Sequence, residues 1–230
     1  MQDDAAFLGR TKLFGGLGAE GLEAIAASAT PRVVRSGQAV FPQGGEPTHL
    51  HLVAEGRVKI WQQAGSGAPL TIRFMEPGDV PGCVAVFRRI PYPATATAVL
   101  DSKLLTWPWA RVGELLERHP RFAANAVEVV GTRTEEMLHR LREFATEPVE
   151  RRIARALLRL SGQAGRPVGA GVEIAFPLSR QDIAEMTGST RYTVSQTLRG
   201  WERQGLVAGG RRRVVVRAPA RLGAIGSVDR

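Results

Sequence analysis

The stretch PLSRQDIAEMTGSTRYTVSQTLRGWERQGLV, residues 177–207, carries the clearest structural signal in the chain. Ser179 is a residue type that caps helices, and Asp182 follows it at the three-residue spacing of a capping box. Gly188 can adopt the positive φ that a tight turn needs, and Thr190 can cap a second helix after that turn. Two short helices joined by a glycine-containing turn are typical of a helix-turn-helix.

The second helix is expected to run from Arg191 to about Arg203, and its apolar residues fix which face is buried. The buried stripe is Val194, Leu198 and Trp201. The opposite face then presents polar side chains at the N-terminal half of the helix, where such a helix meets base edges in a major groove. The candidate base contacts are Arg191, Tyr192, Ser195 and Gln196.

A hairpin is expected after this helix, with strands at residues 206–207 and 213–216 around a turn at 208–212. Its tip is rich in arginine, and clustered guanidinium groups suit the phosphate oxygens of a nucleic-acid backbone. The sequence therefore predicts a winged module. The candidate phosphate contacts are Ser179, Arg180, Thr190, Thr193, Arg199, Arg211, Arg212 and Arg213.

The charge of the chain is concentrated in this C-terminal part. Residues 149–230 contain 15 Lys/Arg and 6 Asp/Glu, a net charge of +9, which is the formal net charge of the whole chain. Residues 1–148 contain 16 of each kind and are neutral. This asymmetry favours a polyanionic partner such as nucleic acid for the C-terminal part alone, and a solvated basic surface is the alternative.

The N-terminal part has a different pattern of apolar residues and glycines. Residues 13–29 carry a helical pattern, and short apolar runs separated by glycine follow. The runs that predict strands are residues 33–34, 39–41, 50–53, 57–61, 70–74 and 102–107. Many short strands at this spacing predict a sandwich, roll or barrel, and such a body commonly encloses a ligand cavity.

A long helix is predicted from Arg121 to Ala145, where Gly131 is the only glycine and proline is absent. Its apolar residues recur at about 3.5 residues, with Arg133 interrupting, which favours a dimer seam. A helix packed on its own β-body is the alternative. The predicted dimer contacts are Phe122, Ala126, Val130, Met137, Leu141 and Phe144.

Pro148 marks the end of the long helix. An amphipathic helix, a loop at 162–171 and a strand at 172–176 are expected before the helix-turn-helix. The chain is therefore divided into a sensory domain (1–120), a dimerisation helix (121–147) and a DNA-binding domain (148–230).

Several function classes are disfavoured. No run of 18 apolar residues is present, and the acidic N-terminus MQDDAAFLGR is unlike a signal peptide, so we expect a cytoplasmic protein without membrane contact. The single cysteine, Cys83, excludes an internal disulfide and a four-cysteine iron–sulfur cluster. No metal site is predicted. No P-loop, His-Glu-x-x-His or Gly-x-Ser-x-Gly motif indicates an enzyme.

Nearly end to end, the chain resembles the cyclic-AMP receptor protein / fumarate–nitrate reduction regulator (Crp/Fnr) family. The segments that carry the resemblance are LFGGLGAEGLEAIA (13–26), FPQGGEP (41–47), AEGRVKIW (54–61), PGDV (77–80), PVERRIARALLRL (148–160) and the helix-turn-helix. The resemblance implies an α+β protein with a cyclic-nucleotide-binding-like β-roll (jelly roll), a long dimerisation helix and a winged helix-turn-helix. It also implies a homodimer on a palindromic double-stranded DNA operator, with RNA polymerase as a partner.

Members of this family often carry a glutamate and an arginine on the recognition helix where this chain has Tyr192 and Gln196. Glutamine can bond adenine through two hydrogen bonds, whereas the absent glutamate removes an acceptor for cytosine. The operator preference of the better-known members is therefore not expected here.

The effector is also expected to differ. Family members that bind cyclic nucleotides hold the ribose with a glutamate and the phosphate with an arginine, and this chain has Cys83 and Pro93-Ala94 at those places. Loss of the guanidinium removes a charge-assisted anchor, so cyclic AMP is not expected to bind. The candidate effector-pocket residues are Gly82, Cys83, Arg88, Arg89, Tyr92, Ala94 and Thr95.

The identity of the effector stays open. The alternatives are haem that responds to nitric oxide, with Cys83, His49 or His51 as axial ligand, thiol redox sensing at Cys83, and another small ligand. A regulator that works without an effector, and a non-specific architectural DNA binder, are the alternative functions.

Overall fold

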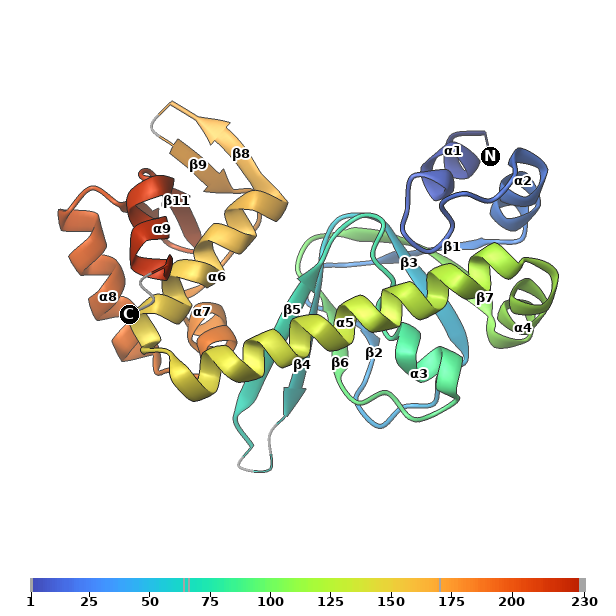
Figure 1. Ribbon diagram of the computed structural model, residues 1–230, viewed down its shortest axis with the longest axis horizontal. Helices are drawn as coiled ribbons and strands as arrows, with labels where there is room; N and C mark the ends of the chain where they lie inside the picture. The colour runs from blue at the N-terminus through green and yellow to red at the C-terminus, as the bar shows by residue number, and fades with distance from the viewer. Residues whose placement is uncertain (1, 64, 66, 170, 228–230) are drawn as a thin grey trace. The chain divides into compact units, whose positions relative to one another are not determined.

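The computed structural model describes residues 2–63, 65, 67–169 and 171–227 (Figure 1). The chain divides into two compact units, one made of residues 1–66 and 72–137 and the other of residues 67–71 and 138–230. The first unit contains most of the strands, and the second contains the helix-turn-helix.

Two sheets form the body of the first unit, with residues 69–71 of one edge strand falling in the second unit, and the strand pairs described within each sheet are antiparallel. One sheet has the order β1 (Thr30–Val34), β7 (Ser102–Pro108), β3 (His49–Glu55). The other has the order β2 (Ala39–Phe41), β6 (Thr95–Ala98), β4 (Val58–Gln63), β5 (Pro69–Met75). All six predicted strands are present, and the β-roll is confirmed.

The helices of this unit depart from the prediction in several places. They are α1 (Gln2–Gly9), α2 (Ala19–Ala27), α3 (Cys83–Arg88) and α4 (Trp109–Arg118). The helix expected at residues 13–29 is present only as α2, because residues 12–16 form a turn in which Gly16 has a φ of 75°. A right-handed helix cannot include that φ. The sequence also missed α3, a helix of six residues, which is too short for a periodic pattern to identify.

Aromatic side chains join the start of the long helix to the core of the first unit. Trp107 is fully buried, and its Nε1 donates a hydrogen bond of 3.0 Å to the carbonyl oxygen of Ile25. The ring of Phe14 lies 5.2 Å from that of Trp107 and 5.3 Å from that of Phe122. Asn125 adds hydrogen bonds to the carbonyl oxygens of residues 13 and 15. The first turns of the long helix are therefore part of this core.

The long helix, α5, runs from Pro120 to Thr146 and confirms the predicted helix. Proline suits the first position because its nitrogen needs no intrahelical partner there. The boundary between the two compact units falls inside α5, after residue 137.

The second unit combines helices with a four-stranded sheet of order β10-β11-β9-β8. Its elements are α6 (Val149–Ala164), β8 (Gly165–Val168), β9 (Gly171–Ile174), α7 (Arg180–Thr187), α8 (Arg191–Arg203), β10 (Val207–Gly210), β11 (Arg213–Val216) and α9 (Pro219–Ser227). The loop expected at 162–171 is wrong, because α6 extends to Ala164 and β8 pairs with β9. Ala170, in that expected loop, lies outside the described residues.

Within the described residues, no helix is both long enough and apolar enough to cross a lipid bilayer.

Candidate nucleic-acid interface

The first helix of the helix-turn-helix is fixed at both ends. The Ser179 hydroxyl accepts a hydrogen bond of 3.0 Å from the backbone N–H of Asp182, and the Asp182 carboxylate accepts one of 2.9 Å from the backbone N–H of Ser179. This is the predicted capping box. Gly188 ends α7 with a φ of 57°, in the left-handed region that favours glycine.

The second helix is capped and buried as the sequence predicts. The Thr190 hydroxyl accepts a hydrogen bond of 3.0 Å from the backbone N–H of Thr193. The three apolar residues of the predicted stripe, Val194, Leu198 and Trp201, are all buried. The indole Nε1 of Trp201 donates to Glu150 of α6 at 3.0 Å, which fixes the rotation of α8 against its neighbour.

The opposite face of α8 gathers the predicted base contacts. A shallow surface hollow of about 370 Å³ is lined by five polar residues, Arg191, Tyr192, Ser195, Gln196 and Arg199. Tyr192 is 72% exposed. The Gln196 Nε2 donates a hydrogen bond of 2.9 Å to the Tyr192 hydroxyl, so two of these side chains act as a pair.

Arg180, a predicted phosphate contact, is engaged within the module. Its guanidinium lies 3.7 Å from the Glu202 carboxylate and 3.5 Å from the carbonyl oxygen of Ser195. These contacts join α7 to α8, so Arg180 has a structural role that the sequence did not indicate.

The predicted wing is the β10–β11 hairpin, with a shorter turn than expected. The strands leave only Arg211 and Arg212 between them, and both side chains are exposed. Arg212 has a φ of 58°, a conformation that costs a residue with a Cβ about 1–2 kcal/mol. An exposed arginine is therefore held in a strained position at the tip of the wing.

Arg213 differs from the two residues before it. Its guanidinium donates hydrogen bonds of 2.8 and 3.2 Å to the carboxylate of Glu173 on β9, and Arg166 on β8 binds the same carboxylate. Hydrogen bonds from the two guanidinium groups lower the pKa of Glu173, and the bonds to Glu173 raise the pKa of Arg213. The Arg213 side chain is still 58% exposed, and two guanidinium groups share one carboxylate, so its assignment to phosphate stays a prediction.

The end of the long helix meets the turn between α7 and α8. A Cβ placed on Gly188 would lie 2.8 Å from Cε1 of Phe144. The Arg152 guanidinium lies 5.3 Å from the centre of the Phe144 ring and donates hydrogen bonds to the carbonyl oxygens of Thr187 and Glu147. Sequence reasoning missed Arg152, which looks like one basic residue among many in α6.

The predicted dimer contacts on α5 fall into two groups. Phe122 and Ala126 are buried in the core of their own protomer, so their assignment to a dimer interface is corrected. Val130 is half-buried, and Met137, Leu141 and Phe144 are exposed. Val127, which the prediction omitted, is 74% exposed.

The residue that interrupts this seam, Arg133, has a partner in the β-roll. Its guanidinium donates a hydrogen bond of 2.7 Å to Asp79 in the PGDV turn. Arg73 on β5 lies 3.5 Å from the same carboxylate and 2.8 Å from Glu136 of α5. The interruption in the apolar pattern is thus explained by a partly buried charge cluster that holds α5 to the roll.

The predicted effector-pocket residues near α3 differ in exposure: those at the start of the helix are packed in the core, and those at its end are exposed. Gly82 begins α3, and a Cβ there would lie 2.6 Å from the ring of Tyr92 and 2.8 Å from that of Phe41. These two rings stack 3.7 Å apart, and burial raises the pKa of Tyr92 to about 12. Arg88 and Arg89 are exposed at the other end.

The side chains of Arg89, Ala94 and Thr95 are all placed by contacts within the protein. The Arg89 guanidinium lies 3.6 Å above the Trp109 ring. Ala94 is buried, and the Thr95 hydroxyl accepts a hydrogen bond of 3.0 Å from the backbone N–H of Gln43.

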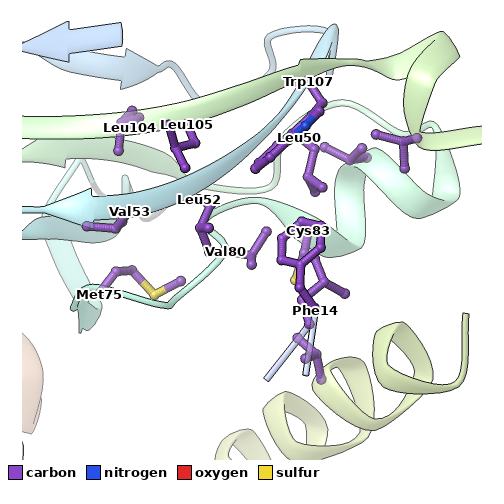
Figure 2. Close-up of a cluster of buried hydrophobic side chains, with 14 of the residues drawn as sticks. Phe14, Leu50, Leu52, Val53, Met75, Val80, Cys83, Leu104, Leu105 and Trp107 are labelled. Carbon is purple, nitrogen blue, oxygen red and sulfur yellow. The ribbon is translucent and has the colours of Figure 1, made fainter. Parts of the chain in front are cut away.

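Cys83 lies among apolar side chains of the core (Figure 2) and is 4% exposed. Burial raises the pKa of its thiol, against the opposing effect of Arg133. Since the thiolate is the reactive form of cysteine, this environment favours a structural role over redox chemistry.

His51 is an interior residue, although the strand pattern did not distinguish it from His49. The centre of its ring lies 5.7 Å from that of Phe41 and 6.2 Å from that of His49, and its Nδ1 is buried without a hydrogen-bond partner among the described residues. Burial, with smaller effects from Arg32 and His49, lowers the pKa of His51 to about 3. The ring is therefore neutral at physiological pH.

Comparisons with known proteins cover both units. The profile of the cyclic nucleotide-binding domain matches residues 31–119, and the profile of the Crp-like helix-turn-helix domain matches residues 151–225. The cyclic AMP receptor protein of Thermus thermophilus is 29% identical over 210 residues, which cover 91% of this chain and 94% of that protein.

Solved structures give the same result for the fold. The structure of FixK2 from Bradyrhizobium japonicum matches with a TM-score of 0.75 at 20% identity, covering 88% of this chain and 99% of that one. The catabolite activator protein of Thermus thermophilus matches with a TM-score of 0.55 at 29% identity, covering 94% of this chain and 98% of that one.

Proposed function

This chain belongs to the Crp/Fnr family of transcription regulators, and from that premise we propose that it binds a palindromic operator sequence-specifically as a homodimer and answers to an effector other than cyclic AMP. The single observation that carries the proposal is the polar face of α8. Three buried apolar residues fix the rotation of this helix, and five polar residues line the hollow on the side away from them.

The polar face divides into base-reading and backbone-binding parts. Arg191, Tyr192, Ser195 and Gln196 occupy the first half of α8, the part of a recognition helix that contacts base edges. The hydroxyls and guanidinium groups around them bind phosphates, which set the register of the protein on the duplex. This set is Ser179, Arg180, Thr190, Thr193, Arg199, Arg211, Arg212 and Arg213.

The dimer forms along α5. Val127, Thr134 and Leu141 repeat at seven residues, and a second series three residues further on holds Val130, Met137 and Phe144. These are the a and d positions of a two-stranded coiled coil. A two-fold dimer places two recognition helices on two inverted half-sites, so the operator is palindromic. As a regulator of transcription, the dimer has RNA polymerase as its further partner.

The pocket residues argue against a cyclic nucleotide. The Cys83 thiol is a weak hydrogen-bond partner for a ribose hydroxyl, and Pro93 has no backbone N–H for a phosphate. A phosphate buried without a charge partner loses several kcal/mol, and Arg89 is already stacked on Trp109.

Two experiments test the proposal. Selection from a random duplex library should enrich one inverted repeat, whereas enrichment of no motif would favour an architectural DNA binder. Calorimetry with cyclic AMP and cyclic GMP should show no heat of binding at micromolar concentration. A micromolar dissociation constant for either nucleotide contradicts the effector part alone.

A further inference from the structure

We propose that Tyr192 is a positioning residue that orients the amide of Gln196 to read adenine, so that the pair, rather than Gln196 alone, sets one base of each half-site. This inference rests on the proposed function, sequence-specific binding through α8.

Tyr192 and Gln196 form a hydrogen-bonded pair on the exposed face of α8. Residues four apart lie on the same face of a helix, and the Gln196 Nε2 donates to the Tyr192 hydroxyl at 2.9 Å. Both residues line the hollow on the exposed face of α8. An exposed glutamine ordinarily samples many rotamers, and ordering it on a base costs conformational entropy. The contact with Tyr192 selects one arrangement before DNA arrives.

The Gln196 amide presents different donors and acceptors on its different edges. A glutamine amide has one N–H on the same side as its own oxygen and one on the opposite side. If the opposite N–H serves Tyr192, Oε1 and the second N–H remain together on one edge. Adenine presents a matching edge in the major groove, the N6 amino group as donor and N7 as acceptor.

The reversed amide would give a different result. With Oε1 turned to the tyrosine hydroxyl, both N–H groups would face the groove, and they would match the two acceptors of guanine, O6 and N7. The structure has Nε2 of Gln196 directed at the Tyr192 hydroxyl, and in that orientation the free edge of the amide matches adenine rather than guanine.

The neighbouring Arg191 adds a second expectation. Its exposed guanidinium can bond guanine through O6 and N7. The half-site should therefore combine a guanine that depends on Arg191 with an adenine that depends on the Tyr192–Gln196 pair.

The test begins with the operator selected by the full-length wild-type protein from random duplexes. Dissociation constants are then measured for all four bases at each base pair of a half-site, for wild type, Tyr192→Phe, Gln196→Ala and the double variant. Tyr192→Phe removes only the hydroxyl. Arg203→Gln, an exposed residue near the end of α8 outside the proposed contacts, is the matched control.

For the wild type we expect one base pair at which adenine is preferred by about tenfold or more. Tyr192→Phe should reduce that preference at least threefold and leave the other positions and the affinity for random DNA unchanged. The double variant should discriminate no worse than Gln196→Ala, because the hydroxyl acts through Gln196. Arg203→Gln should keep the wild-type preference.

Three results overturn the inference. They are an undiminished adenine preference in Tyr192→Phe, additive losses in the double variant, and a wild-type preference for guanine at the position that depends on Gln196. All three leave sequence-specific binding intact. A wild type that enriches no motif overturns the proposed function as well.

Discussion

The ring of Phe144, in the last turns of α5, packs against Gly188 in the turn between the two helices of the helix-turn-helix. The space between them is too small for a methyl group, since a Cβ on Gly188 would lie 2.8 Å from Phe144 Cε1. Arg152 reinforces the contact through the carbonyl oxygen of Thr187. The end of the proposed dimer helix therefore contacts the turn that joins α7 to α8.

Gly188→Ala should destabilise the protein and weaken DNA binding. The added methyl group meets the Phe144 ring, and alanine also loses about 1–2 kcal/mol in the left-handed conformation. We expect the free energy of unfolding to fall by about 2 kcal/mol or more, measured by urea denaturation.

A matched control separates the two effects. Gly205 has a φ of 70°, but no atom lies within 4 Å of a Cβ placed there. Gly205→Ala should therefore lose only the conformational part, about 1–2 kcal/mol. Phe144→Leu should partly rescue Gly188→Ala. Equal losses in both glycine variants would show that the Phe144 contact is unimportant.

Arg212→Gly should change stability and DNA affinity in opposite directions. Glycine relieves the left-handed strain at φ 58°, so the free energy of unfolding should rise by about 0.5–1 kcal/mol. Loss of a phosphate contact should weaken binding to all sequences alike and reduce the salt dependence by about one ion per protomer. An unchanged salt slope, measured by titrations between 50 and about 200 mM salt, would remove Arg212 from the interface.

His51 should make the protein less stable in mild acid. Its folded pKa of about 3 lies below the ordinary 6.5, so the unfolded state binds the extra proton. The stability from the neutral ring is complete above pH 6.5 and is lost as the pH falls from 6.5 towards 3. At pH 5 the loss is about 2 kcal/mol. His51→Phe keeps a ring beside Phe41 and should abolish this part of the loss, as denaturation at pH 7 and pH 5 would show. The same loss in the variant would contradict the assignment.

The exposed series on α5 should hold the dimer together. Val127→Glu with Leu141→Glu buries carboxylates in the apolar seam, which costs several kcal/mol, and sedimentation should show monomers. Arg142→Glu also introduces a glutamate, but one residue outside the series, and should leave the dimer intact. A double variant that still sediments as a dimer would place the interface elsewhere.

The sequence predicted the parts of the fold that have long or capped patterns. The capping box at Ser179, the buried stripe of α8 and the uninterrupted α5 were all recognisable, because each depends on local spacing. The turn at Gly16 and the short helix α3 were missed, since their form depends on packing against distant residues.

The site was predictable in its residue types but not in its contacts. The sequence placed Arg213 with the phosphate-binding residues, and only the pairing of β11 with β9 brings it to Glu173. It placed Phe122 on the dimer seam, whereas the tertiary fold buries that ring against Phe14. Both contacts were missed for one reason: a periodic pattern shows which face of an element is apolar or basic, but not what covers that face.

The most direct test of the account is the ratio of affinities for the selected operator and for a scrambled duplex at one fixed, near-physiological salt concentration. The account predicts that the wild type binds the operator at least about a thousandfold more tightly. In a variant with both Arg191→Ala and Gln196→Ala the ratio should fall by a factor of about ten or more, while affinity for the scrambled duplex changes much less. A wild-type ratio near one would contradict sequence-specific recognition by α8.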